Sequence, residues 1–147
     1  MTNMDDLNRA KEVLQKEKYT FVLIKRGKLI KTSYKKGVLP LLEVINGDDQ
    51  VLNKAIIADK VIGRAAALLV ANYQVKAVYA GTISEKAREI LDNNSVFYQF
   101  GQYVPYIKNR NQTDQCPLEK LTSSISSPDS AYEQILQFYQ QVLKINI

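Results

Sequence analysis

The chain has 147 residues and a formal net charge of +5, with 46% hydrophobic and 24% charged residues. This balance is typical of a globular protein with one core, and no apolar run is long enough to span a bilayer. The sequence contains no histidine and one cysteine, Cys116, which excludes an internal disulfide and the usual ligand set of a zinc site. We therefore expect a single domain over residues 1–147, with no metal, no cofactor and no membrane contact.

The N-terminus is acidic, with Asp5 and Asp6, and lacks the basic-then-apolar order of a secretory signal. A cytoplasmic location is expected on this basis. Residues 5–18 carry apolar side chains at helical spacing and predict an amphipathic first helix. Residues 19–24 and 28–34 then predict a hairpin that turns at Arg26-Gly27.

A second helix is expected to open at Pro40 and to close at Asn46-Gly47. The short apolar run 55–58 predicts a central strand covered on both faces, which stops at Asp59-Lys60. A nearly all-apolar helix over 61–71 and a strand over 75–79 complete a βαβ unit.

Ser84 is the expected N-cap of a helix over 85–91, which a strand near 96–100 follows. A final helix is expected to start at Ser127-Pro128-Asp129. The alternation of strands and helices favours the α/β class, and we expect a three-layer αβα architecture around a mixed sheet of about five strands.

Six basic residues fall within one short segment: Lys25, Arg26, Lys28, Lys31, Lys35 and Lys36. They concentrate positive potential that could attract nucleotides, nucleic acid or a protein. Lysines on edge strands also prevent association between sheets, and no aromatic stacking pattern or RNA-binding motif accompanies the charge. Edge protection is therefore favoured over nucleic-acid binding, and homodimer formation is left open.

The end of the apolar strand is the most informative place for chemistry. In open α/β sheets ligands gather at the carboxyl ends of strands, where helix N-termini offer unpaired N–H groups. Lys60 and Arg64 add positive charge there, so we expect Asp59, Lys60, Gly63 and Arg64 to bind a small anion. The alternative is that Asp59 caps the helix and pairs with Lys60 or Arg64.

The second candidate is Cys116, which with Pro117 stands at the expected start of a short helix that also carries Glu119. A helix dipole can lower a thiol pKa and activate the thiolate, but without histidine a lysine or carboxylate would have to move the proton. Cys116 as a small, partly buried apolar residue is the favoured alternative. Three tyrosines are expected to be core residues whose hydroxyl groups contact water: Tyr98, Tyr103 and Tyr106.

Several segments resemble the uncharacterised prokaryotic family DUF1893: residues 58–67, residues 75–80, Val104-Pro105-Tyr106 and Cys116-Pro117-Leu118-Glu119. The similarity runs from about the Tyr19 hairpin to the C-terminal helix. It implies a cytidine-deaminase-like fold, a mixed sheet flanked by helices, and no established activity.

Zinc deaminases carry H-x-E and then P-C-x-x-C at a helix start. By chain order, residues 59–63 lie where P-C-x-x-C would be, and residues 37–43 lie near the place of H-x-E, yet neither segment supplies a histidine or cysteine. Zinc-dependent deamination is therefore disfavoured. Glu43 is either a remaining general acid or base, or a solvated helix carboxylate.

Three functional interpretations follow. The preferred one is a non-catalytic domain that binds a small anionic or nucleotide-like ligand through the Asp59-Lys60 turn, with Cys116 and Glu119 nearby. The first alternative is a metal-independent enzyme that uses Lys60 or Cys116, with Glu119 as a further catalytic candidate. The second is a nucleic-acid or protein-binding module that acts through the basic hairpin.

Overall fold

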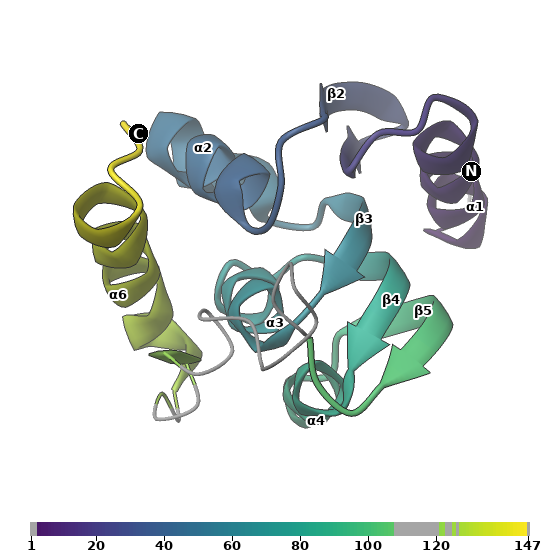
Figure 1. The fold of residues 1–147 in the computed structure, drawn as a ribbon. Coiled ribbons are helices and arrows are strands. Elements are labelled where there is room, and N and C mark those ends of the chain that lie inside the picture. Colours follow the sequence, from purple (N-terminus) through teal and green to yellow (C-terminus); the bar gives the residue numbers. More distant parts are fainter. Residues whose placement is uncertain (1–2, 108–120, 123–124, 126, 147) are drawn as a thin grey trace.

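A mixed sheet runs through the centre of the computed structural model, which describes residues 3–107, 121–122, 125 and 127–146 (Figure 1). The five strands lie in the order β2-β1-β3-β4-β5. Their bounds are β1 (Phe21–Lys25), β2 (Lys28–Ser33), β3 (Ile56–Ile62), β4 (Ala77–Ser84) and β5 (Phe97–Val104). β1 is antiparallel to both β2 and β3, whereas β3, β4 and β5 are mutually parallel. The expected mixed sheet of about five strands is confirmed.

Helices cover both faces of this sheet, which gives three layers (Figure 1). Of the helices in the described part of the chain, α1 (Asn3–Lys16) covers one face. The opposite face carries α2 (Leu39–Asp48), α3 (Arg64–Asn72), α4 (Glu85–Asn93) and α6 (Ala131–Gln137). The sequence-based expectation of a three-layer αβα architecture is therefore confirmed.

α1 packs on the sheet through Leu7, Ala10 and Leu14, whose spacing places them on one side of the helix. They contact a cluster that includes Val22 of β1 and Ile56 of β3. Burial of a leucine side chain contributes roughly 1.5–3 kcal/mol, so this face holds α1 in place. Acidic residues in the first turn and a lysine in the last turn also suit the helix dipole.

α3 is the most deeply buried helix on the opposite face. Residues Ala65 to Val70 are all buried, and the three consecutive alanines at its start allow the backbone to approach the sheet closely. The next helix, α4, begins where the sequence predicts. The Ser84 hydroxyl accepts a hydrogen bond from the Ala87 backbone N–H at 3.2 Å and caps α4.

β3 is longer than the sequence indicates, and the expected strand end at Asp59-Lys60 is wrong. The ladder with β4 continues until Ile62 pairs with Ile83, and α3 begins at Arg64 with Gly63 as its N-cap. Asp59 therefore does not cap the helix. Two polar residues in succession suggest the end of a strand, but the parallel neighbour keeps satisfying the β3 backbone beyond them.

The three parallel strands approach one another closely at Gly81 and Gly101. A Cβ atom on Gly81 would lie 2.6 Å from the Lys60 carbonyl oxygen, and one on Gly101 would lie 2.9 Å from the Gly81 carbonyl oxygen. Both obstacles are backbone atoms, which cannot move without disturbing the ladder. Glycine is therefore required where β4 and β5 pass this level of the sheet.

Gly81→Ala is expected to destabilise the protein by about 1–3 kcal/mol, because the added methyl group collides with the Lys60 carbonyl. Gly47→Ala is the matched control, since nothing lies within 4 Å of a Cβ added in that last turn of α2. The control should be neutral or slightly stabilising through helix propensity. Urea unfolding of the two variants measures the difference, and equal midpoints would contradict the steric argument.

Candidate functional site

The structure divides the site residues that the sequence predicts to act together. Asp59 pairs in register with Phe21 and Ala80, both of which belong to the cluster under α2 and α3. Lys60 instead borders a cavity beside α1. Consecutive strand residues point to opposite faces, so the two side chains cannot contact one ligand from the same side of the sheet. Cys116 and Glu119 lie outside the described residues.

Asp59 is a buried carboxyl group on the face that carries four helices. Its side chain is only 5% exposed, and Oδ1 accepts a hydrogen bond from the Val61 backbone N–H at 3.3 Å. Burial raises the pKa of Asp59 to about 8, although hydrogen bonds from the backbone of Val61 and Lys60 act in the opposite direction. At neutral pH the carboxyl group is therefore mostly protonated, and it is a poor partner for a cation.

Arg64, another predicted ligand residue, binds backbone instead. Its Nε donates to the Thr122 carbonyl at 2.5 Å, and Nη2 donates to the Ile125 carbonyl. Thr122 and Ile125 are both buried. The guanidinium thus holds these two residues against the start of α3, next to the partly buried N-cap Gly63.

Lys60 borders a cavity of about 300 Å³ between α1 and the sheet, which we call the Lys60 pocket. Its two cationic lining residues are Lys18 and Lys60, and the lining includes no carboxylate. The other lining residues are Leu14, Gln15, Tyr19, Tyr79 and Gly81. The pocket therefore combines positive charge with an aromatic and aliphatic wall.

Tyr79 forms the wall of the Lys60 pocket that lies on β4. Its hydroxyl accepts a hydrogen bond of 3.5 Å from the Gln15 side-chain amide, and the Lys11 ammonium lies 5.1 Å from the ring centroid. This cation–π contact adds positive charge next to the pocket. Gly81 borders the pocket on the same strand, with its backbone close to the Lys60 carbonyl.

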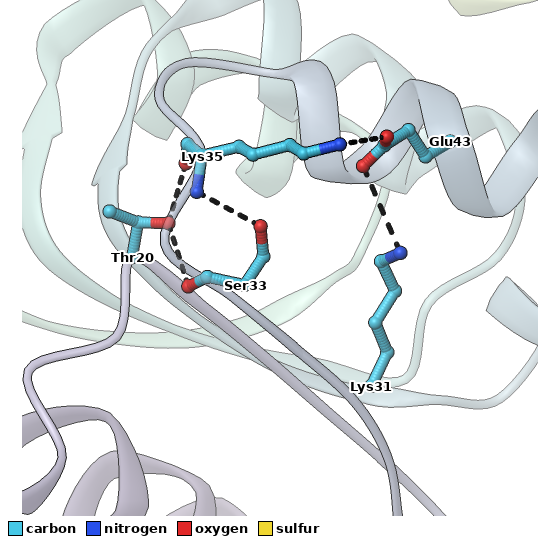
Figure 2. Close-up of polar contacts among 5 residues, drawn as sticks. All are labelled: Thr20, Lys31, Ser33, Lys35 and Glu43. Atoms are coloured by element: carbon cyan, nitrogen blue, oxygen red, sulfur yellow. Dashed lines mark hydrogen bonds and ion pairs between the residues drawn. The ribbon is translucent and has the colours of Figure 1, made fainter. Parts of the chain in front are cut away.

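Two of the six basic residues clustered in the hairpin segment form ion pairs with one carboxylate, Glu43 (Figure 2). The Lys35 ammonium lies 2.5 Å from Glu43 Oε2, and the Lys31 ammonium lies 3.8 Å from Oε1. Glu43 is thus part of an ion-pair network that joins the hairpin to α2. Glu43 is therefore an ion-paired, partly exposed carboxylate rather than a solvated one with no partner.

Thr20, next to the ion pairs of Glu43, forms hydrogen bonds to the end of the hairpin and to β3. Its hydroxyl lies 2.9 Å from the Ser33 carbonyl oxygen and 2.5 Å from that of Lys35, and the Ser33 hydroxyl accepts from the Lys35 N–H at 3.0 Å (Figure 2). The Thr20 carbonyl accepts from the Lys60 backbone N–H at 2.9 Å. This network therefore helps to fix the backbone from which the Lys60 side chain extends.

Two further cations of the six, Lys25 and Arg26, border a second cavity of about 500 Å³ together with Lys54 and Lys76. Sequence reasoning missed Lys54 and Lys76, because they are far from the hairpin in the chain and carry no motif. The only available signal was that Lys54 directly precedes the predicted strand over 55–58 and that Lys76 lies near the start of the predicted strand over 75–79. Strands that are parallel and adjacent bring such residues to the same end of the sheet.

Of the tyrosines near β5, Tyr98 packs against the core as expected, whereas the expectation is wrong for Tyr103 and Tyr106. Tyr103 and Tyr106 are exposed, and Tyr98 is half-buried, with its hydroxyl donating to Asp92 Oδ1 at 2.9 Å. β5 is an edge strand of the sheet, so no further strand of the described residues pairs with its outer side. Arg88 lies over the rings of Phe100 and Tyr103 and stabilises this exposed aromatic group.

Comparison with known proteins matches the family model of the domain of unknown function DUF1893 to residues 9–139. The chain belongs to the DUF1893 family. The crystal structure of a DUF1893 family protein from Thermotoga maritima, TM1506, superposes with a TM-score of 0.82 over 90% of this chain and 89% of that chain, at 22% sequence identity. At this identity the likeness shows a shared fold. No curated protein matches this DUF1893 chain.

Within its described residues, this DUF1893 protein has no group of three His, Cys, Asp or Glu side chains that could hold a metal ion. The same part of the chain contains no helix long and apolar enough to cross a membrane. Among the cavities of the described residues, the two considered above are lined by basic side chains and are the candidate anion sites.

The raised pKa of Asp59 predicts an unusual dependence of stability on pH. The unfolded chain ionises Asp59 near 3.8 and the folded chain near 8, so the folded state binds more protons between these values. Stability contributed by this group is complete below about pH 4 and is lost as the pH rises through 8. Each unit of pKa shift corresponds to about 1.4 kcal/mol, so the loss should reach a few kcal/mol.

Asp59→Asn removes the ionisation while it retains the size of the side chain. We expect the variant to gain stability relative to the wild type steadily from pH 4 to pH 8. Urea unfolding at several pH values measures the free energy of unfolding of both proteins. The contributions of all other titrating groups cancel in the difference between them. Parallel curves for the two proteins across this window would refute the burial argument.

Proposed function

We propose that this protein binds a small anionic molecule with an aromatic or aliphatic body in the Lys60 pocket. The observation that carries the proposal is the composition of the lining: Lys18 and Lys60 supply two positive charges, and no carboxylate opposes them. An anionic group of the ligand would neutralise this charge. The apolar part of the ligand would replace water against Tyr19, Tyr79 and Leu14.

The size of the pocket supports a small ligand. A volume of about 300 Å³ is at the lower end for ligand-binding pockets and suits an aromatic carboxylate or a mononucleotide. Part of the wall is fixed before binding, because Tyr79 bonds to Gln15 and the Lys60 backbone bonds to Thr20. A preformed wall lowers the entropic cost of binding.

We further propose that the scaffold is a cytidine-deaminase-like fold. A mixed sheet flanked by helices supports this, as does the burial of α2 and α3 on the same face of the sheet. Zinc deaminases carry their ligands at the openings of two such helices. Here α2 opens with Leu39-Pro40 and α3 with Arg64, which are not metal ligands. The proposed anion site lies on the opposite, α1-covered face.

The test uses calorimetry with two probes, adenosine monophosphate and benzoate, at low and high salt. Lys60→Met retains most of the apolar stem but removes the charge, and it should weaken binding at least tenfold, or about 1.4 kcal/mol. Binding to the wild type should also weaken as salt is added, since the attraction is between charges near the surface.

Lys86→Met is the matched control, because Lys86 is an exposed lysine on α4, which packs on the opposite face. It should bind both probes like the wild type. Failure of benzoate to bind the wild type, or equal benzoate affinities of the Lys60 and Lys86 variants, would reject the Lys60 pocket as an anion site.

A further inference from the structure

The second cavity lies where three segments of the chain meet at one end of the sheet, and we call it the turn cavity. It has a volume of about 500 Å³ and is bordered by the hairpin turn, by the residues before β3 and by the residue before β4. Ile56, the first residue of β3, contributes to its lining. Lys60 is four residues further along the strand, which corresponds to about 13 Å at 3.3 Å per residue. The turn cavity is therefore a site separate from the Lys60 pocket.

Four cations border the turn cavity: Lys25 and Arg26 from the hairpin, Lys54 from the loop before β3, and Lys76. The one carboxylate in the lining is Asp6 of α1. The lining thus carries a net charge of about +3, from four positive groups and one negative group. Convergent positive charge repels itself unless an anion is present, and a concave surface strengthens its potential.

The backbone that presents these cations is held by bonds outside the cavity. The Arg9 guanidinium donates to the Gly27 carbonyl at 2.6 Å, and the backbone N–H groups of Lys54 and Lys76 donate to the carbonyls of Gln74 and Ala55, each at 2.9 Å. Arg26 has a φ of 53° and Lys54 a φ of 61°, a conformation that non-glycine residues rarely adopt. Lys54 and Lys76 therefore project from fixed backbone positions, and the Lys25 ammonium is itself held by the Gln50 carbonyl at 2.7 Å.

Asp6 provides a second, independent observation. Its Oδ1 atom is buried and has no hydrogen-bond partner among the described residues. A buried acceptor without a donor is costly, and native structures normally satisfy it with a group outside the chain when the chain supplies none. Because Asp6 borders the turn cavity, a hydroxyl group of a ligand bound there can donate a hydrogen bond to its carboxylate, which lacks a partner at Oδ1.

We propose that the turn cavity binds a phosphorylated polyol, such as a sugar phosphate or the ribose phosphate part of a nucleotide. The phosphate contacts the lysine and arginine side chains, and a hydroxyl group of the ligand donates a hydrogen bond to the Asp6 carboxylate. Both requirements are needed, because a plain anion would satisfy the cations but would be repelled by the carboxylate. The volume of about 500 Å³ accommodates a ligand of this class.

The experiment compares ribose phosphate, sulfate and ribose as probes by calorimetry on the full chain. Wild-type protein should bind ribose phosphate at least tenfold more tightly than sulfate and should bind ribose weakly. Lys76→Ala should weaken both anions severalfold, because it removes one of the four cations. Lys86→Ala, the exposed lysine on α4, is the control and should change neither.

Asp6→Ala gives the more specific result, since it should act on the two anions in opposite directions. Sulfate should bind more tightly, because a repelling charge is removed, whereas ribose phosphate loses its hydroxyl acceptor. The ratio of the two affinities should therefore fall about tenfold. Asp5→Ala is the control, because it removes a carboxylate from the same first turn of α1 and should preserve the ratio.

Equal wild-type affinity for ribose phosphate and sulfate, an unchanged ratio in Asp6→Ala, or no effect of Lys76→Ala would each overturn the proposal. Lys60→Met separates this site from the Lys60 pocket. It should leave the preference for ribose phosphate over sulfate intact even if it abolishes the binding of benzoate.

Discussion

The structure depends on one strand, β3, which is paired on both sides and covered on both faces. Its side chains must alternate between two environments, and the backbone allows no exception while both ladders are maintained. Asp59 consequently enters the interior under four helices, and Lys60 enters the cavity beside α1. Adjacent residues in the sequence thus acquire opposite electrostatic roles: a carboxyl group that burial keeps protonated, and an ammonium that borders an open pocket.

The basic hairpin shows how the same kind of residue takes several roles. Lys31 and Lys35 neutralise Glu43 and fasten the hairpin to α2. Lys25 and Arg26, at the turn, face a cavity that also receives Lys54 and Lys76. The positive charge of the chain is therefore not one uniform surface. It is partly used within the fold, and partly gathered where the ends of neighbouring strands meet.

Much of the fold could be predicted from the sequence. Helical spacing located α1, β-branched runs around Arg26-Gly27 located the hairpin, and Ser84 marked the start of α4, all because local propensity and the tertiary fold agree there. The extent of β3 could not be predicted, because its polar second half is held by hydrogen bonds to a neighbouring strand. The exposure of Tyr103 followed from the edge position of β5, which depends on strand order.

The candidate site was predicted only in part. The sequence by itself determined that the chain is an α/β protein without histidine ligands, and that Lys60 stands next to a central apolar strand. Only the tertiary structure decided which side of the sheet each residue faces, that Arg64 binds the carbonyls of Thr122 and Ile125, and that Lys54 and Lys76 join the hairpin turn. The reason is physical: composition and periodicity are local properties, whereas a cavity forms where segments distant in the chain are brought together by strand pairing.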